Sequence, residues 1–92
     1  MIYQTTTGER VCERFGLFDV GLSDGAQAAL GHLLHVQLPH VGQFVDKGQH
    51  LFVVEGSQTS AEFYSPVDGY VNSFTDDPNI SDLLVTLKPR EI

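Results

Sequence analysis

Four histidines and one cysteine are the side chains best suited to bind a metal or attack a substrate, but their spacing supports neither chemistry. His32 and His35 are three residues apart in a segment with strand character, so they face opposite sides and cannot hold one ion together. His40 and His50 each lie near a predicted turn. No further metal ligands follow at the usual spacing, so we expect no metal site. We expect the charge of the histidines to change between about pH 5 and 8.

Nucleophilic and phosphate-binding motifs give no stronger signal. Cys12 lies in a predicted strand, and free cysteines are among the most buried residue types. The acidic loop at 76–82 lacks the calcium-loop pattern, and residues 56–58 lack the spacing and the lysine of a phosphate loop. No Gly-x-Ser-x-Gly elbow occurs. We therefore expect no catalytic residue and a protein that is not an enzyme.

Length and charge limit the class of protein further. With 92 residues, the chain makes one small domain spanning 1–92, since typical domains have about 100–150 residues. The net charge of −7 disfavours nucleic acid and anionic membranes as partners, because both require concentrated positive charge. No apolar run reaches the about 20 residues of a membrane helix, and residues 1–10 have no signal-peptide core. The single cysteine excludes an internal disulfide, and we expect a cytoplasmic protein.

Apolar spacing and turn signals predict an all-β fold with one short helix. Ser23 and Asp24 are suitable N-cap residues, and Asp24 with Gln27 fits a capping box. Gly31 fits the left-handed end of a helix of about two turns. Residues 1–8 fit either a loose arm or an edge strand. Short apolar runs separated by Gly and Pro are typical of a small barrel or sandwich. The predicted strands are 11–20, 33–38, 44–45, 51–55, 61–64, 70–74 and 83–87.

Three sequence blocks follow the order and separation of a known pattern. They are Val20–Asp24 with Ala26–Gly31, then Val36–Pro39 with Val41–Gly42 and Val45–Gly48, then Val53–Glu55 with Tyr64–Val67, Gly69 and Val71. Together they cover about half of the chain. The pattern resembles the H-protein of the glycine cleavage system and, more broadly, the lipoyl- and biotinyl-carrier domains. The resemblance implies a barrel-sandwich hybrid, in which two small sheets pack face to face and a tight hairpin carries the modified lysine.

The residue at the carrier position departs from the family. The resemblance places the lipoyl-lysine between Glu55 and Tyr64, and counting from either flank puts Gln58 at that position. A carboxamide nitrogen is not a usable nucleophile, because its lone pair is delocalised. We therefore expect no cofactor. The alternative is lipoate on an unexpected lysine, with Lys47 in a turn considered before Lys88 in the last strand.

Two further departures concern the flanks of the family pattern. Arg10 stands about where the resemblance implies a tryptophan. The segment at 75–82 is shorter than the helical segment that precedes the family's last strand. A reduced flank would change the surface on which a swinging arm docks.

These observations predict a protein-interaction module of the H-protein type that lacks the lipoyl-lysine. The expected partner is lipoate ligase, a glycine cleavage component or an enzyme encoded nearby. A polar turn residue without a role is the alternative for Gln58. Two other functions stay open: a carrier that shuttles an aminomethyl or acyl group through Lys47, and a structural module that forms a homo-oligomer through edge strands. The predicted partner surface comprises Glu55, Ser57, Gln58, Thr59 and Glu62.

Overall fold

The computed structural model describes residues 2–74 and 83–89, which form nine strands and one short helix. This content confirms the predicted all-β class with one helix. The predictions for the acidic loop at 76–82 and the shortened segment at 75–82 fall outside the described residues. No helix in the described ranges is long and apolar enough to span a membrane. The elements are β1 (Ile2–Gln4), β2 (Glu9–Arg14), β3 (Leu17–Leu22), α1 (Asp24–Leu30), β4 (Leu33–Gln37), β5 (Phe44–Val45), β6 (His50–Gly56), β7 (Ser60–Tyr64), β8 (Gly69–Phe74) and β9 (Leu83–Pro89).

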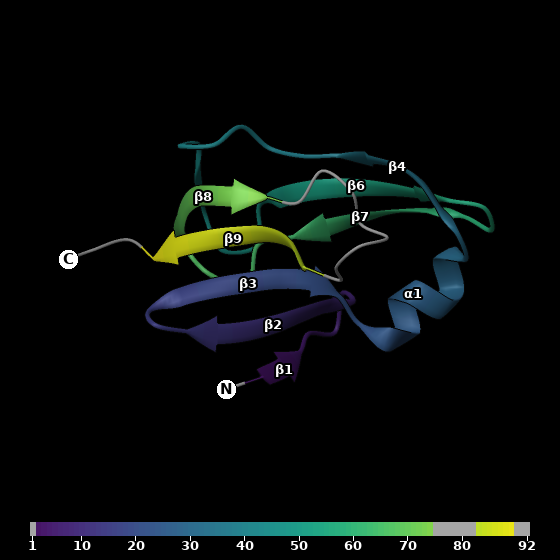
Figure 1. Cartoon of the computed structure of the whole chain (residues 1–92), viewed down its shortest axis with the longest axis horizontal. Helices are drawn as coiled ribbons and strands as arrows, with labels where there is room; N and C mark the ends of the chain where they lie inside the picture. Colours follow the sequence, from purple (N-terminus) through teal and green to yellow (C-terminus); the bar gives the residue numbers. More distant parts are fainter. Residues whose placement is uncertain (1, 75–82, 90–92) are drawn as a thin grey trace.

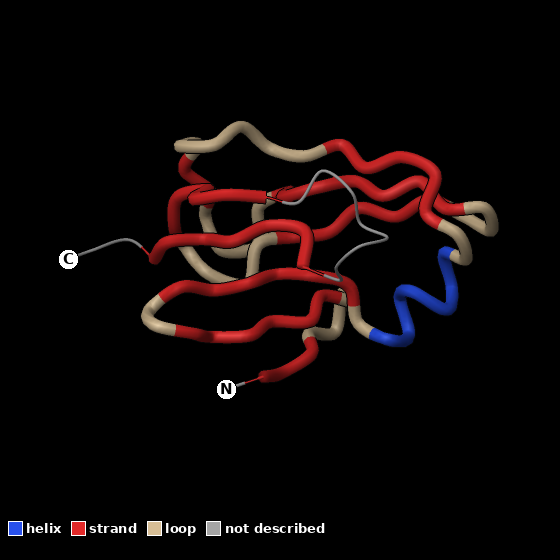
Figure 2. Tube along the Cα trace, viewed as in Figure 1, coloured by secondary structure: helices blue, strands red, loops and turns tan. Residues whose placement is uncertain are grey.

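The strands form two antiparallel sheets, and α1 lies at one end of the molecule (Figures 1 and 2). The larger sheet has the order β1-β2-β3-β9-β8-β5, and the smaller has the order β4-β6-β7. Residues 2–4 pair with β2. Of the two alternatives predicted for residues 1–8, a loose arm or an edge strand, this part of the chain therefore forms the edge strand. The pairing of β3 with β9 joins the first part of the chain to its last strand.

The hydrophobic core lies between the two sheets and takes alternate residues from their strands. Phe52 on β6 and Phe63 on β7 stack with ring centroids 5.1 Å apart. Full burial of each ring stabilises the fold by about 2–3 kcal/mol. A register shift between His50 and Phe52 interrupts the strict alternation, and Leu51 and Phe52 are both buried there. The buried core cluster comprises Val20, Leu22, Leu30, Val45, Leu51, Phe52, Val54, Phe63, Val71, Val85 and Leu87.

The prediction of a single strand over 11–20 was wrong. The segment contains parts of β2 and β3, which are joined by a two-residue turn at Phe15 and Gly16, with Arg14 opposite Leu17. Both turn residues have positive φ, 52° and 77°, as a type I′ turn requires. Such turns favour Asn-Gly, and a phenylalanine at the first position hides the signal in the sequence. Phe15 is 97% exposed, so it does not belong to the apolar run of either strand.

The ends of α1 agree only in part with the predicted caps. Ser23 is the N-cap, and its Oγ accepts a hydrogen bond from the backbone N–H of Ala26. The predicted capping box of Asp24 and Gln27 was wrong, because the Gln27 side chain instead donates to the carbonyl oxygen of Leu22. Gly31 ends the helix with a φ of 77°, as predicted.

The β6–β7 turn docks onto the end of α1 through backbone hydrogen bonds. The N–H of Gln58 donates to the carbonyl oxygen of Leu30 over 2.9 Å, and the N–H of Ser57 donates to that of His32 over 2.8 Å. The Ser57 Oγ in turn accepts from the N–H of His32 at 3.0 Å. Three hydrogen bonds therefore hold the tip of the hairpin against the helix end and the start of β4.

Two glycines make this close approach possible. A Cβ at Gly56 would overlap the carbonyl oxygen of Leu30, and a Cβ at Gly31 would overlap the Ser57 Oγ. Because the obstacle at Gly56 is backbone, it cannot move aside without shifting the helix end. The contact between hairpin and helix thus requires the absence of a side chain at both positions.

We expect Gly56→Ala to destabilise the domain by about 1–3 kcal/mol, because the methyl group pushes the hairpin away from α1. At about 4–8 °C per kcal/mol for a domain of this size, thermal unfolding followed by circular dichroism would detect the change. Gly25→Ala is the matched control, since a Cβ there meets open space in a helix and should stabilise by about 0.5–1 kcal/mol. Equal effects of the two substitutions would contradict the docking account.

Candidate functional site

The predicted partner surface is gathered on the hairpin tip and on the outer side of the smaller sheet. Ser57, Gln58 and Thr59 form the exposed turn. Glu55 lies opposite Ser60 in the register, and Glu62 lies opposite Val53, so both carboxylates alternate with core residues and point outward. Diagonal neighbours on one face of a sheet lie about 7–8 Å apart. Glu55 and Glu62 therefore lie on the outer face of the smaller sheet, next to the turn that holds the other three predicted residues.

Gln58 combines a fixed backbone with an exposed side chain. Its N–H is hydrogen bonded to Leu30, while its carboxamide can both donate and accept hydrogen bonds toward a partner. The carboxamide cannot serve as a nucleophile, because its nitrogen lone pair is delocalised. The tip is therefore suited to recognition by hydrogen bonds.

Lys47 lies away from the tip. It is exposed in the turn before β6, and the seven residues of β6 separate that turn from the hairpin tip by roughly 20 Å. The Lys47 N–H donates to the Asp68 carboxylate over 2.6 Å. Lys88, the other lysine, is exposed near the end of β9. Neither amine thus takes the place that the carrier lysine has in the resemblance.

A buried carboxylate, which the sequence analysis missed, lines the same pocket as Lys47. Glu9 is only 1% exposed, and its Oε1 accepts hydrogen bonds from the hydroxyls of Thr5, at 2.6 Å, and Thr7. Its Oε2 accepts the backbone N–H of Tyr64 at 3.3 Å. The alternation Thr5, Thr7, Glu9 in the sequence was the signal that could have identified the group.

A pocket of about 520 Å³ opens next to this carboxylate. Most of the surface of this pocket is apolar, and the Glu9 carboxylate that lines it is buried and already hydrogen bonded. The lining residues are Tyr3, Thr5, Thr7, Glu9, Lys47, Gly48, Tyr64, Ser65 and Pro66.

The four histidines are exposed and separate. His35 lies in β4, His32 just before it, His40 in the following loop and His50 at the start of β6. Within the described ranges, no three His, Cys, Asp or Glu side chains are grouped to hold a metal ion. His50 packs edge to face on Tyr64, with ring centroids 6.4 Å apart.

The Tyr64 phenol is coupled to the predicted surface through Glu62. Its hydroxyl donates to the Glu62 Oε2 over 3.2 Å. This hydrogen bond, together with the negative charge of Glu62, raises the pKa of Tyr64 above its usual value of 10.0. The phenol therefore stays protonated at neutral pH and holds the Glu62 carboxylate on the outer face of β7.

The two facing antiparallel sheets and the docked hairpin define a barrel-sandwich hybrid of the lipoyl-carrier type. The sequence profile described as Glycine cleavage H-protein matches residues 3–89, and the chain belongs to this family. The predicted resemblance and the predicted fold are thereby confirmed.

Individual relatives agree with this assignment. The chain is 36% identical to the glycine cleavage system H protein of Legionella pneumophila (strain Corby), over 92% of this chain and 77% of the relative. It is also 36% identical to the glycine cleavage system H protein of Thermus thermophilus, over 79% of this chain and 66% of the relative. A crystal structure of a glycine cleavage system H protein from Mycobacterium marinum matches with a TM-score of 0.84 and 27% identity, covering 96% of this chain and 83% of that one.

Family membership corrects the prediction of no cofactor. Glycine cleavage H-proteins carry lipoate, which is the cofactor of the family and was given only as the alternative. They are carriers that act with other proteins of the system and are not themselves catalysts. Gln58, at the position that the resemblance gives to the carrier lysine, has a carboxamide, which does not fit covalent attachment of lipoate. The amines of the described residues are those of Lys47 and Lys88.

We expect Glu62→Gln to lower the pKa of Tyr64 toward 10, since the substitution removes the negative charge beside the phenol. Because the pKa of Tyr64 is raised, its hydrogen bond with Glu62 stabilises the folded state below pH 10. This stabilisation is lost as the pH rises through the pKa that Tyr64 has in the folded protein. Absorbance at 295 nm during alkaline titration measures the transition. The chain has three tyrosines, and Tyr64→Phe identifies which of their absorbance transitions belongs to Tyr64. An unchanged transition in Glu62→Gln would refute the coupling.

Proposed function

We propose that this chain is a protein-binding module of the H-protein type that acts as one domain, 1–92, in the cytoplasm. The observation that carries the proposal is the hairpin tip, which is exposed yet held by three hydrogen bonds to the end of α1 and the start of β4. A surface that is already ordered loses less conformational entropy when a partner binds. Gln58 then serves as a hydrogen-bonding residue at the centre of the contact.

The charge around the tip indicates the chemistry of the partner. Glu55 and Glu62 are exposed on one face, and Tyr64 holds the Glu62 carboxylate in place. Complementary partners present cations to such a face, which favours correct encounter and orientation. The candidates are lipoate ligase, a glycine cleavage component and an enzyme encoded nearby.

A second candidate function is a lipoate carrier that uses Lys47. The observation that favours it is the position of this lysine, which is exposed and lines the pocket that contains the Glu9 carboxylate. Lipoate joined by an amide bond to the Lys47 amine would supply a disulfide able to take up an aminomethyl or acyl group. Glu9 and the hydroxyls of Thr5 and Thr7 would then line the space beside the attached arm.

A structural role is the third candidate. β1 and β5 lie at the edges of the larger sheet, and β4 and β7 at the edges of the smaller one. Such strands can pair with a second copy of the chain. A homo-oligomer of this kind would show a concentration-dependent mass in analytical ultracentrifugation and no sensitivity to changes at the tip.

We expect the combined substitution of Glu55→Gln, Gln58→Ala and Glu62→Gln to weaken binding of purified lipoate ligase at least about tenfold, or 1.4 kcal/mol. Biolayer interferometry with the immobilised chain measures the affinity. Glu13→Gln is the matched control, because it removes one exposed carboxylate on β2, far from the tip. Equal losses in the control, or unchanged binding in the tip variant, would contradict a tip-centred contact.

The carrier alternative is tested by intact-protein mass spectrometry after co-expression with lipoate ligase and added lipoate. We expect Gln58→Lys to gain the mass of one lipoyl group, since the substitution places an amine on a tip that is already ordered. A lipoyl adduct that forms on the natural sequence and is absent from Lys47→Arg would favour the carrier function over the protein-binding function. Lack of modification in Gln58→Lys would show that the ligase does not recognise this tip.

A further inference from the structure

A row of cationic and aromatic residues crosses the outer face of the larger sheet, which is the face turned away from β4, β6 and β7. Arg14 on β2 lies opposite Leu17 on β3. Phe18 lies opposite Leu87, so Leu17 is next to Lys88 on β9. The row continues because Lys88 lies opposite Tyr70 and Tyr70 opposite Phe44. We call Arg14, Leu17, Lys88, Tyr70 and Phe44 the end row.

Alternation along the strands places the end row outside the core. Leu87 and Val71 are core residues, so their neighbours Lys88 and Tyr70 point to the other face. Lys88 is exposed, and Tyr70 is 46% exposed. Phe44 packs edge to face on Tyr70 with ring centroids 5.1 Å apart, which gives the row a fixed aromatic end.

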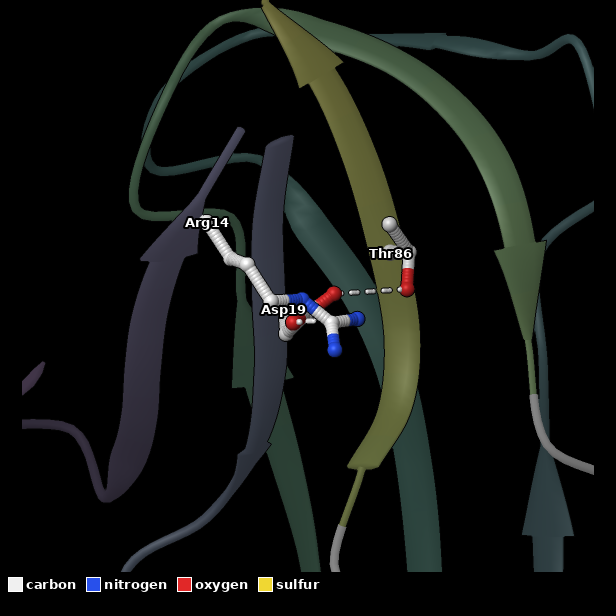
Figure 3. A network of polar contacts seen from close by, with 3 residues as sticks. All are labelled: Arg14, Asp19 and Thr86. Atoms are coloured by element: carbon white, nitrogen blue, oxygen red, sulfur yellow. Dashed lines mark hydrogen bonds and ion pairs between the residues drawn. The ribbon is translucent and has the colours of Figure 1, made fainter. Parts of the chain in front are cut away.

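The buried carboxylate on this face is already neutralised. Asp19 is 2% exposed, and its oxygens contact the guanidinium of Arg14 at 3.2 Å and the hydroxyl of Thr86 at 3.0 Å (Figure 3). A guanidinium has five N–H donors, and that of Arg14 is 58% exposed. Arg14 is therefore held in place by Asp19 while donors remain for an external carboxylate.

Cationic side chains are concentrated on this face, although the whole chain is acidic. The sequence has a net charge of −7. Of the four cationic side chains in the described ranges, Arg10, Arg14 and Lys88 occupy outward positions on this sheet, and Lys47 lies elsewhere. Most of the other charged residues in the described ranges are acidic, so an acidic segment is attracted to this face more than to the remainder of that part of the chain.

Phe15 adds an aromatic side chain in the turn between Arg14 and Leu17. It is 97% exposed and has a φ of 52°, a conformation that costs free energy for a bulky residue. Asparagine or glycine would suit this turn better, and the exposed ring gains almost no burial within the chain. A strained residue without an internal benefit points to an external one.

We propose that the end row and Phe15 bind an extended acidic segment of a protein partner, in which carboxylates alternate with apolar side chains. The five strands of the row span roughly 20 Å, which matches about six extended residues. Carboxylates would pair with Arg14 and Lys88, and apolar side chains would contact Phe15 and Tyr70. The β2–β3 turn next to this row lies at the opposite end of the molecule from the β6–β7 tip, so a partner could contact both independently (Figure 1).

The test uses a short fluorescein-labelled peptide of alternating Glu and Leu, followed by fluorescence anisotropy at low and at physiological salt. We expect Lys88→Glu to weaken binding about tenfold and added salt to weaken it further. Lys47→Glu is the matched control, because it makes the same charge change outside the end row, and it should alter the affinity less than about twofold. A peptide with Gln in place of Glu should not bind.

Phe15→Asn separates function from folding. We expect this substitution to raise the melting temperature by several degrees, since asparagine fits the turn, and to weaken peptide binding several-fold. A purely structural Phe15 would not produce these opposite changes. A raised melting temperature with unchanged binding would remove Phe15 from the site.

Other outcomes would overturn the proposal as a whole. Equal losses in Lys88→Glu and Lys47→Glu would show unspecific attraction. NMR shifts caused by the peptide at 57–59 rather than at the end row would place binding on the hairpin tip. A single-stranded oligonucleotide that binds as tightly as the peptide would point to nucleic acid, and a dimer of the free chain that Lys88→Glu dissociates would point to a second copy. None of these results bears on the ligase experiment.

Discussion

The contact between the β6–β7 tip and the end of α1 is the constraint on which the rest of the site depends. It joins two backbones directly, through the carbonyl oxygens of Leu30 and His32, and so leaves no room for a side chain at Gly31 or Gly56. A two-turn helix is not stable alone in water. Here the hairpin satisfies the Leu30 carbonyl group at its end, while the helix orders the hairpin. The same contact gives Gln58 a defined position.

Two buried carboxylates show how an acidic chain of this size tolerates charge inside. Glu9 is surrounded by the hydroxyls of Thr5 and Thr7 and a backbone N–H, and Asp19 by a guanidinium and a hydroxyl. Hydrogen bonds offset much of the desolvation cost in both cases. Within the described ranges, no buried side-chain polar atom lacks a partner. The difference lies in the surroundings: Glu9 adjoins a pocket, whereas Asp19 holds Arg14 in place on the sheet.

Membership of the glycine cleavage H-protein family determines the fold of this chain. The chemistry available at the hairpin tip depends instead on which side chain the tip carries. The fold presents one side chain on an ordered turn, and this geometry does not depend on whether that side chain is an amine. A carboxamide at position 58 keeps the capacity for hydrogen bonding and removes the capacity for amide formation. The proposed recognition of the tip therefore does not require covalent attachment there, and the Lys47 amine lines a pocket elsewhere.

The sequence by itself determined the features that depend on neighbouring residues. The strands of the second half, the Ser23 cap, the Gly31 helix end and the location of Gln58 on a hairpin all follow from local periodicity, turn residues and the family pattern. Tertiary structure decided the features that depend on pairing between distant segments. Glu9 became a buried pocket group because β7 closes over it, and Lys88 meets Tyr70 only through the register of β8 and β9. The Phe15 turn was hidden for a related reason, since the pairing of β2 with β3 imposes a positive φ that phenylalanine does not itself favour.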